Sequence, residues 1–223
     1  MAIAFGAIAR GKNDSTVSSL TYTGPAVTGS DKIGVVHVQT NSASGDVVTG
    51  ITWAGNAMTR ISVRASGNQY LYAYYILAPS SLPSIVITCS TNSFGIYSHA
   101  AYYTGVKQTG QPDSSATGSA TGNLTLTTTT VADNSWKISL ARNVIAGVPN
   151  AGTGTTIREG GGAYAIGSGD GNADVTPAGS TSMQWTTGSG TTWGIIYSVA
   201  PVAGGGFVPT PMMHHLQIAG GLM

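Results

Sequence analysis

The sequence predicts an all-β protein, a single jelly-roll or Ig-like β-sandwich followed by an extended C-terminal arm. Apolar and polar residues alternate with a period of two through most segments, and helical periodicity is nearly absent. Turn-forming residues recur at spacings near ten residues, which is typical of sandwiches and barrels built from many short strands. We expect the sandwich domain to cover residues 1–202 and the arm to cover residues 203–223.

The alternating segments define the expected strands in chain order. They are Val17–Tyr22, Lys32–Gln39, Val48–Trp53, Ala57–Arg64, Gln69–Leu77, Ser84–Cys89, Tyr97–Thr104, Leu124–Val131, Trp136–Arg142, Thr155–Glu159, Tyr164–Ile166, Ser182–Thr186 and Trp193–Val199. Gly, Pro, Asn and Asp punctuate the chain between them, because these residues supply the backbone angles of tight turns. The Gly/Ser/Thr-rich stretch at about 108–123 is expected to be a long loop between the two halves of the sandwich.

The composition excludes several functional classes. Charged residues make up only 8% of the 223 residues, against about a quarter in an average soluble domain. This low charge, together with abundant Gly, Ser and Thr, indicates a β-rich protein with a surface of hydroxyls and amides. The net charge is +1 and the nine Lys and Arg residues are scattered, so we expect no nucleic-acid partner.

The N-terminal segment does not read as a targeting sequence. Residues 1–10 are apolar but have no basic region before them, so we expect no signal peptide and synthesis in the cytoplasm. No stretch approaches the ~18–20 apolar residues of a membrane span, so no membrane partner is expected. Cys89 is the single cysteine, and its apolar strand pattern predicts a buried thiol.

The sequence offers little for catalysis. It contains four His and eight acidic residues, of which only Glu159 is a glutamate. There is no Gly-x-Ser-x-Gly, His-Glu-x-x-His or Cys-x-x-Cys motif. Paired carboxylates of a glycosidase could still come from distant strands. His37 and His99 fall in strand patterns and are expected to be hydrogen-bonded or packed. The favoured interpretation is a protein without enzymatic activity.

One cluster of oxygen-bearing side chains raises the question of a metal. Asp170, Asn172 and Asp174 alternate in a Gly-containing segment, as ligands of a structural Ca²⁺ can. The twelfth position of such a loop is Thr181 rather than an acid, so the segment is not an EF-hand. An ordinary polar turn is the favoured interpretation, with structural calcium as the alternative; no other cofactor is expected.

Aromatic residues leave two interpretations open. In Gln69–Leu77 both faces are apolar or aromatic, which indicates a central strand covered on both sides. Core packing is the expected role of these tyrosines and of the four tryptophans. The alternative is an exposed platform on which a glycan stacks. The tryptophans concerned are Trp53, Trp136, Trp185 and Trp193.

The C-terminal segment is the strongest functional candidate. Gly204–Gly206 precede a segment without a single Asp, Glu, Lys or Arg. Its prolines disfavour a helix and lower the entropy that an extended arm loses on docking. We expect the arm to bind another protein chain, for example as a strand added to a sheet edge, with His214 and His215 as part of that contact. The expected contact residues are Phe207, Val208, Pro209, Pro211, Met212, Met213, Leu216, Ile218 and Leu222.

Several segments of the sandwich resemble a known group of proteins. The residues that carry this resemblance are Met1–Phe5, Leu20–Gly24, Gly50–Thr59, Tyr70–Tyr75 with Ala78 and Pro79, and Ala101–Thr109 with Gln111–Asp113. The chain resembles a widespread group of largely uncharacterised β-sandwich virion proteins of tailed bacteriophages and metagenomes, of decoration or fibre type. Residues 207–211 and 218–222 also look like tails of phage particle proteins.

The resemblance implies a location in the virion, after synthesis in the host cytoplasm. It favours a capsid decoration or cement subunit that forms a homo-oligomer and binds the major capsid protein or neighbouring copies. The alternative is a receptor- or glycan-binding adhesin of a tail or head fibre. The motifs that carry the resemblance are strands and turns, with no site among them.

Overall fold

The computed structural model describes residues 2–81, 84–145, 148–160 and 166–203. Every regular element in these residues is a β-strand, and the strands pair antiparallel. The N-terminal half contains β1 (Ala4–Thr23), β2 (Ile33–Asn41), β3 (Val48–Trp53), β4 (Asn56–Ala57), β5 (Thr59–Ser66), β6 (Gln69–Leu77) and β7 (Ser84–Thr104). The C-terminal half contains β8 (Ser114–Thr121), β9 (Leu124–Thr129), β10 (Trp136–Asn143), β11 (Asn150–Ala151), β12 (Thr156–Glu159), β13 (Gly167–Asp170), β14 (Ser180–Thr186) and β15 (Thr191–Val199). The prediction of an all-β sandwich is confirmed.

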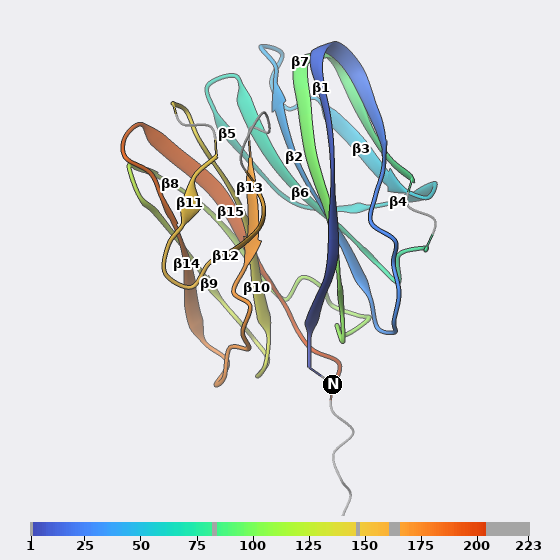
Figure 1. Ribbon diagram of the computed structural model, residues 1–223, viewed down its shortest axis with the longest axis vertical. Helices are drawn as coiled ribbons and strands as arrows, with labels where there is room; N and C mark the ends of the chain where they lie inside the picture. Colours follow the sequence, from blue (N-terminus) through green and yellow to red (C-terminus); the bar gives the residue numbers. More distant parts are fainter. Residues whose placement is uncertain (1, 82–83, 146–147, 161–165, 204–223) are drawn as a thin grey trace, which may run out of the picture.

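Two long strands, β1 and β7, organise the N-terminal half. They pair along their whole length, from Ala4 against Thr104 to Thr23 against Ser84. Register shifts near residues 13–19 of β1 mark irregularities of the bulge type, and bulges let a strand bend. The β1–β7 ribbon therefore arches over at one end of the molecule (Figure 1). One arm of the arch continues through β2, β6 and β5, and the other pairs with β3, which in turn pairs with β4.

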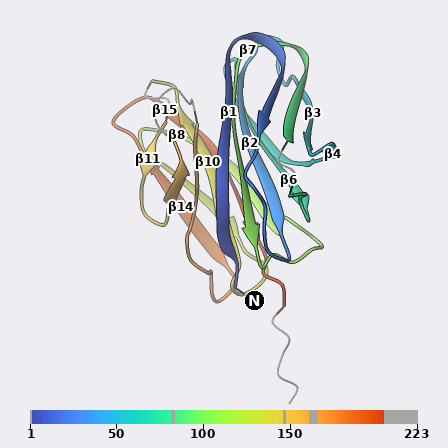
Figure 2. The ribbon, with the colours of Figure 1, turned by 45° about the vertical axis from the view of Figure 1, so that its right-hand side comes forward.

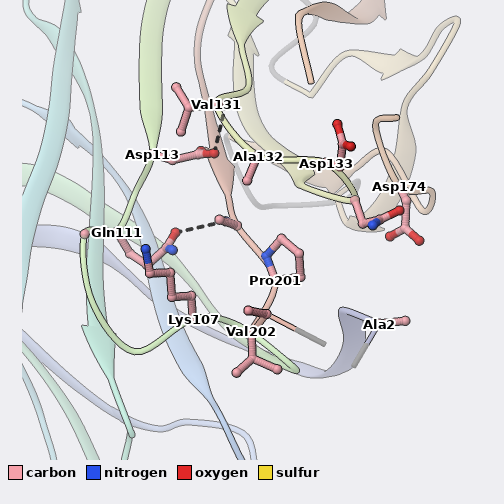
Figure 3. A pocket seen from close by; sticks show the side chains of 14 residues that line it. Ala2, Lys107, Gln111, Asp113, Val131, Ala132, Asp133, Asp174, Pro201 and Val202 are labelled. Atoms are coloured by element: carbon pink, nitrogen blue, oxygen red, sulfur yellow. Dashed lines mark hydrogen bonds between the residues drawn. The ribbon is translucent and has the colours of Figure 1, made fainter. Parts of the chain in front are cut away.

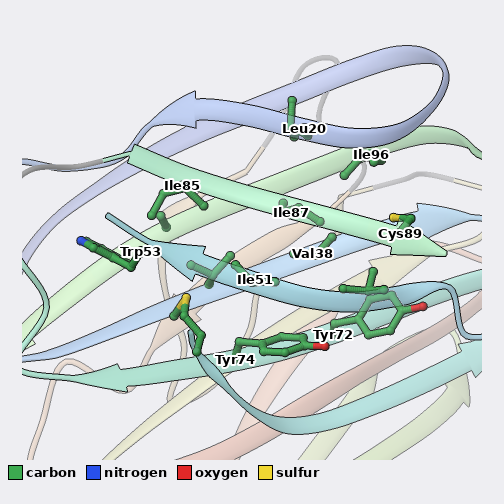
Figure 4. Packing of buried hydrophobic residues seen from close by; sticks show 14 of the residues in the cluster. Leu20, Val38, Ile51, Trp53, Tyr72, Tyr74, Ile85, Ile87, Cys89 and Ile96 are labelled. Atoms are coloured by element: carbon green, nitrogen blue, oxygen red, sulfur yellow. The ribbon is translucent and has the colours of Figure 1, made fainter. Parts of the chain in front are cut away.

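The first hydrophobic core lies between the two arms of this arch. Trp53 and Ile51 from β3 and Ile87 from β7 face Val38 from β2 and Tyr72 from β6 across it (Figure 4). These side chains are almost completely removed from water, which is the main favourable contribution to folding. Cys89 belongs to the same core, and burial raises the pKa of its thiol to about 11. The predicted buried thiol is confirmed.

The C-terminal half is a second sandwich with a smaller core. One sheet has the order β12-β13-β10-β15-β8 and the other the order β11-β14-β9. Leu126, Met183 and Trp185 fill the space between them, and the Trp185 Nε1–H donates to Ser139 Oγ at 3.0 Å. A buried indole N–H is thereby satisfied.

A third, central core joins the halves. The face of β2, β6 and β7 that turns away from the first core packs against β10 and β15, and Figures 1 and 2 show the halves side by side. Its buried members include Val35, Leu71, Tyr103, Trp193 and Tyr197. Because successive side chains of a strand point to opposite faces, β2 and β6 serve two cores at once. The predicted central strand at Gln69–Leu77 is therefore confirmed.

The structure corrects the predicted loop at 108–123. Ser114–Thr121 is the strand β8, paired with β15 at the edge of its sheet. Its residues alternate between half-buried and exposed positions, but all are small, so no apolar pattern marks the period of two. Space is limited at one of these positions, because a Cβ added to Gly118 would lie 3.0 Å from Leu126 Cδ2.

Other predicted boundaries also differ. Val17–Tyr22 is the end of a strand that begins at Ala4, and the predicted strands Ser84–Cys89 and Tyr97–Thr104 are one continuous strand. In each case a polar stretch at the arch interrupts the hydrophobic alternation. Residues 164 and 165 of the predicted strand Tyr164–Ile166 lie outside the described residues, as do residues 204–223 of the arm.

Candidate functional sites: a buried histidine network and a pocket at the chain ends

A network of polar side chains lies inside the central core. His37 of β2 and His99 of β7 stand opposite each other in register. The Ser168 hydroxyl of β13 lies 2.8 Å from Nδ1 of both imidazoles. His37 Nε2 lies 2.8 Å from the Tyr197 hydroxyl of β15. All four side chains are buried, so strands from both halves meet through hydrogen bonds shielded from water.

Burial keeps both histidines uncharged. Desolvation lowers the pKa of His37 to about 3, and repulsion from His99 adds to the effect. The pKa of His99 is also lowered to about 3, by desolvation and then by the charge of Arg10. A neutral imidazole has one N–H donor and one acceptor nitrogen. The Ser168 hydroxyl can therefore donate to one Nδ1 and accept from the other.

A buried ion pair adjoins this network. Arg158 of β12 contacts Asp170 of β13 through two nitrogens, at 2.7 Å from Nε to Oδ2 and 3.0 Å from Nη2 to Oδ1. The Tyr103 hydroxyl donates to Asp170 Oδ2 at 3.1 Å. The Arg158 guanidinium also lies over the Phe5 ring, 4.3 Å from its centroid. Asp170 is completely buried, and its charge is compensated by a bidentate partner.

This pairing decides the outcome for the candidate calcium ligands. Arg158 Nη2 also donates to Asn172 Oδ1 at 2.6 Å, so Asp170 and Asn172 share one guanidinium. Asp174 accepts instead from the Trp136 indole N–H at 2.6 Å. The three oxygen-bearing residues thus serve a protein cation and an indole rather than converging on a common point. Nowhere in the described ranges do three or more His, Cys, Asp or Glu form a group suited to a metal ion.

The histidine network contains the elements of a nucleophile with a base, but its surroundings do not suit a substrate. A catalytic hydroxyl must reach a reacting atom, whereas Ser168 is enclosed by the strands that hold its partners. The pocket described below contains none of these side chains in its lining. The expectation that His37 and His99 are hydrogen-bonded is confirmed. Sequence reasoning missed Ser168 and Tyr197, because they lie 131 and 160 residues from His37 in the chain. It also missed Arg158, because no local motif pairs it with Asp170, 12 residues away.

The second candidate site is a pocket of about 810 Å³ at the end of the molecule where the described residues begin and end. Ala2 and Ala203 both contribute to its lining, and Figure 3 shows the enclosing side chains. The remaining lining residues are Lys107, Gly110, Gln111, Asp113, Val131, Ala132, Asp133, Asn134, Asp174, Ala200, Pro201 and Val202. Its volume falls within the range of ligand-binding pockets.

The last described residues form one wall of this pocket. Val202 N–H donates to Gly105 O at 2.8 Å, and Lys107 N–H donates to Ala200 O at 3.0 Å. The segment leaving β15 is therefore pinned beside residues 105–107. The Gln111 side chain completes the wall, since its Oε1 accepts from Ala200 N–H at 3.1 Å. Gln111 is only 6% exposed, and its Nε2 has no hydrogen-bond partner.

The opposite wall combines an apolar residue with an acidic rim. Val131 is 69% exposed, which is unusual for a branched aliphatic side chain beside a pocket. Asp113, Asp133 and Asp174 contribute three carboxylates, against the single ammonium group of Lys107. Asp113 is held in place by the Ser135 hydroxyl at 3.2 Å. The pocket thus has apolar surface and a negative rim, and an unpartnered amide nitrogen is buried in its wall.

The aromatic residues considered for a glycan platform lie in the cores. Trp53, Trp185 and Trp193 are completely buried, and Trp136 is 7% exposed. Within Gln69–Leu77, Tyr72 and Tyr74 are also buried. The alternative of a tryptophan-based glycan platform is therefore wrong, and core packing is confirmed.

Comparison of the chain with known protein families, curated proteins and solved structures finds no match. The resemblance to phage virion proteins therefore stays a prediction. Within the described part of the chain, no helix is long and apolar enough to cross a membrane. The nine expected contact residues of the arm, from Phe207 to Leu222, lie outside the described residues.

Proposed function

We propose that the protein is a non-enzymatic structural protein of a phage virion, a capsid decoration or cement subunit anchored through its C-terminal arm. One observation carries the proposal: Ala203, the last described residue, lines a pocket that Ala2 also lines. An apolar segment of twenty residues follows that point in the sequence. A body with its attachment segment at one end suits a protein that stands on a surface.

The chemistry of the folded body supports a structural role. Its tryptophans fill cores, its histidines are hydrogen-bonded to Ser168 and Tyr197 of the other half, and its buried aspartate pairs with Arg158. A buried polar network of this kind rigidifies a core when every member has a partner. The low charge of the chain also suits dense packing on a shell, where many like-charged copies would repel one another.

The virion setting and the partners rest on the resemblance of the sandwich segments. In that setting the arm binds the major capsid protein or a neighbouring copy of the subunit, and the subunits form symmetric oligomers. The extended, proline-containing arm would satisfy its backbone by adding to a sheet edge while its apolar residues fill pockets. Methionines such as Met212 and Met213 adapt well to such grooves.

Deleting residues 204–223 tests the anchoring role. The truncated protein is first compared with the full chain by circular dichroism and thermal unfolding, because loss of the fold would confuse the result. We expect an unchanged fold and loss of incorporation into particles. A matched control is Phe94→Ser, which changes a side chain that is 66% exposed on β7, far along the ribbon from Ala203. Normal incorporation of the truncated protein would overturn the anchoring role.

Copy number tests the kind of virion protein. A decoration subunit is expected at a number comparable to that of the major shell protein, measured by densitometry of purified particles. A number closer to that of a tail component would favour the fibre adhesin instead. Such an adhesin would need recognition residues other than the four tryptophans, since these are buried.

A further inference from the structure

We propose that the pocket at the chain ends is a peptide-binding site, and that its occupant in the free subunit is the segment Phe207–Pro211 of the same chain. The inference rests on the proposed function only in taking residues 204–223 as a binding element. It concerns the subunit before assembly, when no shell is present to bind the arm.

Chain length makes this occupant accessible. Ala203 lines the pocket, and only Gly204–Gly206 separate it from Phe207. Four residue steps span roughly 14 Å when fully extended, which is comparable to the width of a compact cavity of 810 Å³. Glycine adopts the backbone angles of a sharp reversal at low steric cost. A linker this short also gives the segment an effective concentration on the order of millimolar near the pocket.

The chemistry of the segment matches the pocket. Phe207 and Val208 supply apolar side chains for the apolar part of the lining, to which Val131, Ala132 and Val202 contribute. The two prolines favour an extended conformation in which the backbone carbonyls have no partner within the segment.

The pocket provides a donor for such a carbonyl. Gln111 Nε2 is buried and has no partner, while its Oε1 is already fixed by Ala200 N–H. An unsatisfied buried amide donor costs free energy, and a carbonyl of Val208 or Thr210 would remove that cost once the side chains that cover Nε2 move aside. This is the polar contact that would fix the orientation of the segment.

Charge agrees with the same occupant. Residues 204–223 contain no Asp or Glu, and their ionisable side chains are His214 and His215. Three carboxylates stand at the rim, so an acidic peptide would be repelled whereas this one is tolerated. Binding in the pocket would keep this apolar segment covered until assembly. The arm would then leave the pocket and bind a site on the partner protein.

A disulfide trap in the full chain tests the proposal. The variant Val131→Cys with Phe207→Cys is oxidised with glutathione at low protein concentration, and the products are mapped by mass spectrometry. Cys89 does not compete, because it is buried and its thiol pKa is raised. We expect an intramolecular disulfide in a monomeric protein.

The matched control is Ser30→Cys with Phe207→Cys. Ser30 is exposed and directly precedes Asp31. The Asp31 carbonyl accepts from Val106 N–H on one side of the 105–107 segment, and Pro201 pairs with Val106 on the other side. Ser30 therefore lies near the last described residues but outside the pocket. Trapping at Val131 is expected to be about tenfold faster than at this control. Adding Ala132→Phe, which fills the pocket, is expected to remove the difference, with circular dichroism confirming the fold.

Two results would overturn the proposal. Equal trapping rates at positions 131 and 30 would show that the segment Phe207–Pro211 has no preference for the pocket. Intermolecular dimers linking Val131→Cys of one chain to Phe207→Cys of another would assign the pocket to a second copy. Neither result bears on whether deletion of the arm abolishes incorporation into particles, so failure of this proposal and failure of the proposed function are distinguishable.

Discussion

His37 in the N-terminal half and Tyr197 in the C-terminal half meet through a contact of 2.8 Å between the imidazole Nε2 and the phenol oxygen. Their rings also form an edge-to-face pair with centroids 5.9 Å apart. Because both groups are buried, neither can find water as a substitute partner while the halves stay together. The two halves are therefore expected to unfold in one cooperative transition.

The lowered pKa values of His37 and His99 make stability depend on pH. Above the unfolded pKa of about 6.5, both histidines are neutral in either state and the free energy of unfolding is insensitive to them. As the pH falls from 6.5 towards the folded value of about 3, the unfolded chain binds protons that the folded protein excludes. The free energy of unfolding then decreases by roughly 2 kcal/mol per histidine between pH 6.5 and 5.

Urea unfolding between pH 7.5 and 5 measures this dependence. His37→Gln is expected to reduce the slope by about half, even if it lowers stability at neutral pH. His214→Gln serves as the matched control, since it changes a histidine of the arm, and it is expected to leave the slope unchanged. A free energy of unfolding that stays constant over this range would contradict the neutral buried pair.

Gly194 allows β15 to lie close to β10. A Cβ at this position would lie 2.5 Å from Leu140 O and 3.0 Å from Leu126 Cδ1. Since a backbone carbonyl cannot move aside cheaply, we expect Gly194→Ala to destabilise the protein by about 1–3 kcal/mol or more.

The control for this substitution is Gly50→Ala in β3. A Cβ at Gly50 would meet no atom within 4 Å, and its backbone needs no positive φ. This change is expected to be neutral or stabilising by up to about 1 kcal/mol. Thermal and urea unfolding of both variants would check the contrast, and equal effects would show that β15 is less tightly packed than the structure has it.

The parts that could be predicted from sequence are those where side-chain size reports burial. Gln69–Leu77 is apolar on both faces, so its position between two cores followed from its pattern. β8 could not be found in this way, because its Ser, Gly, Ala and Thr residues are small on both faces. The ribbon of β1 and β7 was recognised only in pieces, since polar residues at its arch break the alternation.

The buried network was out of reach for a different reason. His37 and Ser168 are 131 residues apart, and no local pattern indicates that two strands so distant will face each other. Asp170 is a different case, because Arg158 is only 12 residues away, yet the spacing of Asp170 with Asn172 and Asp174 suggests calcium until the pairing of β12 with β13 places Arg158 beside it. The alternation of residues predicts which side chains turn inward, but only the sheet order determines which of them meet.

The burial of the tryptophans has a spectroscopic consequence. Trp53, Trp185 and Trp193 are fully buried, and Trp136 is nearly so. We therefore expect blue-shifted fluorescence and weak quenching by acrylamide in the native protein, with both changing on unfolding in urea. Titration with glycans is expected to leave the emission unchanged. Strong native quenching would show that an indole is exposed, which would restore the aromatic platform as an alternative.

If Asp170 pairs with Arg158 rather than with calcium, the stability of the protein should depend on Asp170 but not on added Ca²⁺. Asp170→Asn removes the charge that balances a guanidinium whose side chain is only 18% exposed, and breaking a buried pair in this way costs about 3–5 kcal/mol. Asp14→Asn is the matched control, because Asp14 forms a solvent-exposed ion pair with Lys12, and removing one partner of such a surface pair is expected to change the stability little. Unfolding temperatures measured with added Ca²⁺ and with a chelator are expected to be identical for the unmodified protein. A calcium-dependent increase in stability that Asp170→Asn abolishes would instead mean that the ion displaces Arg158 from these oxygens.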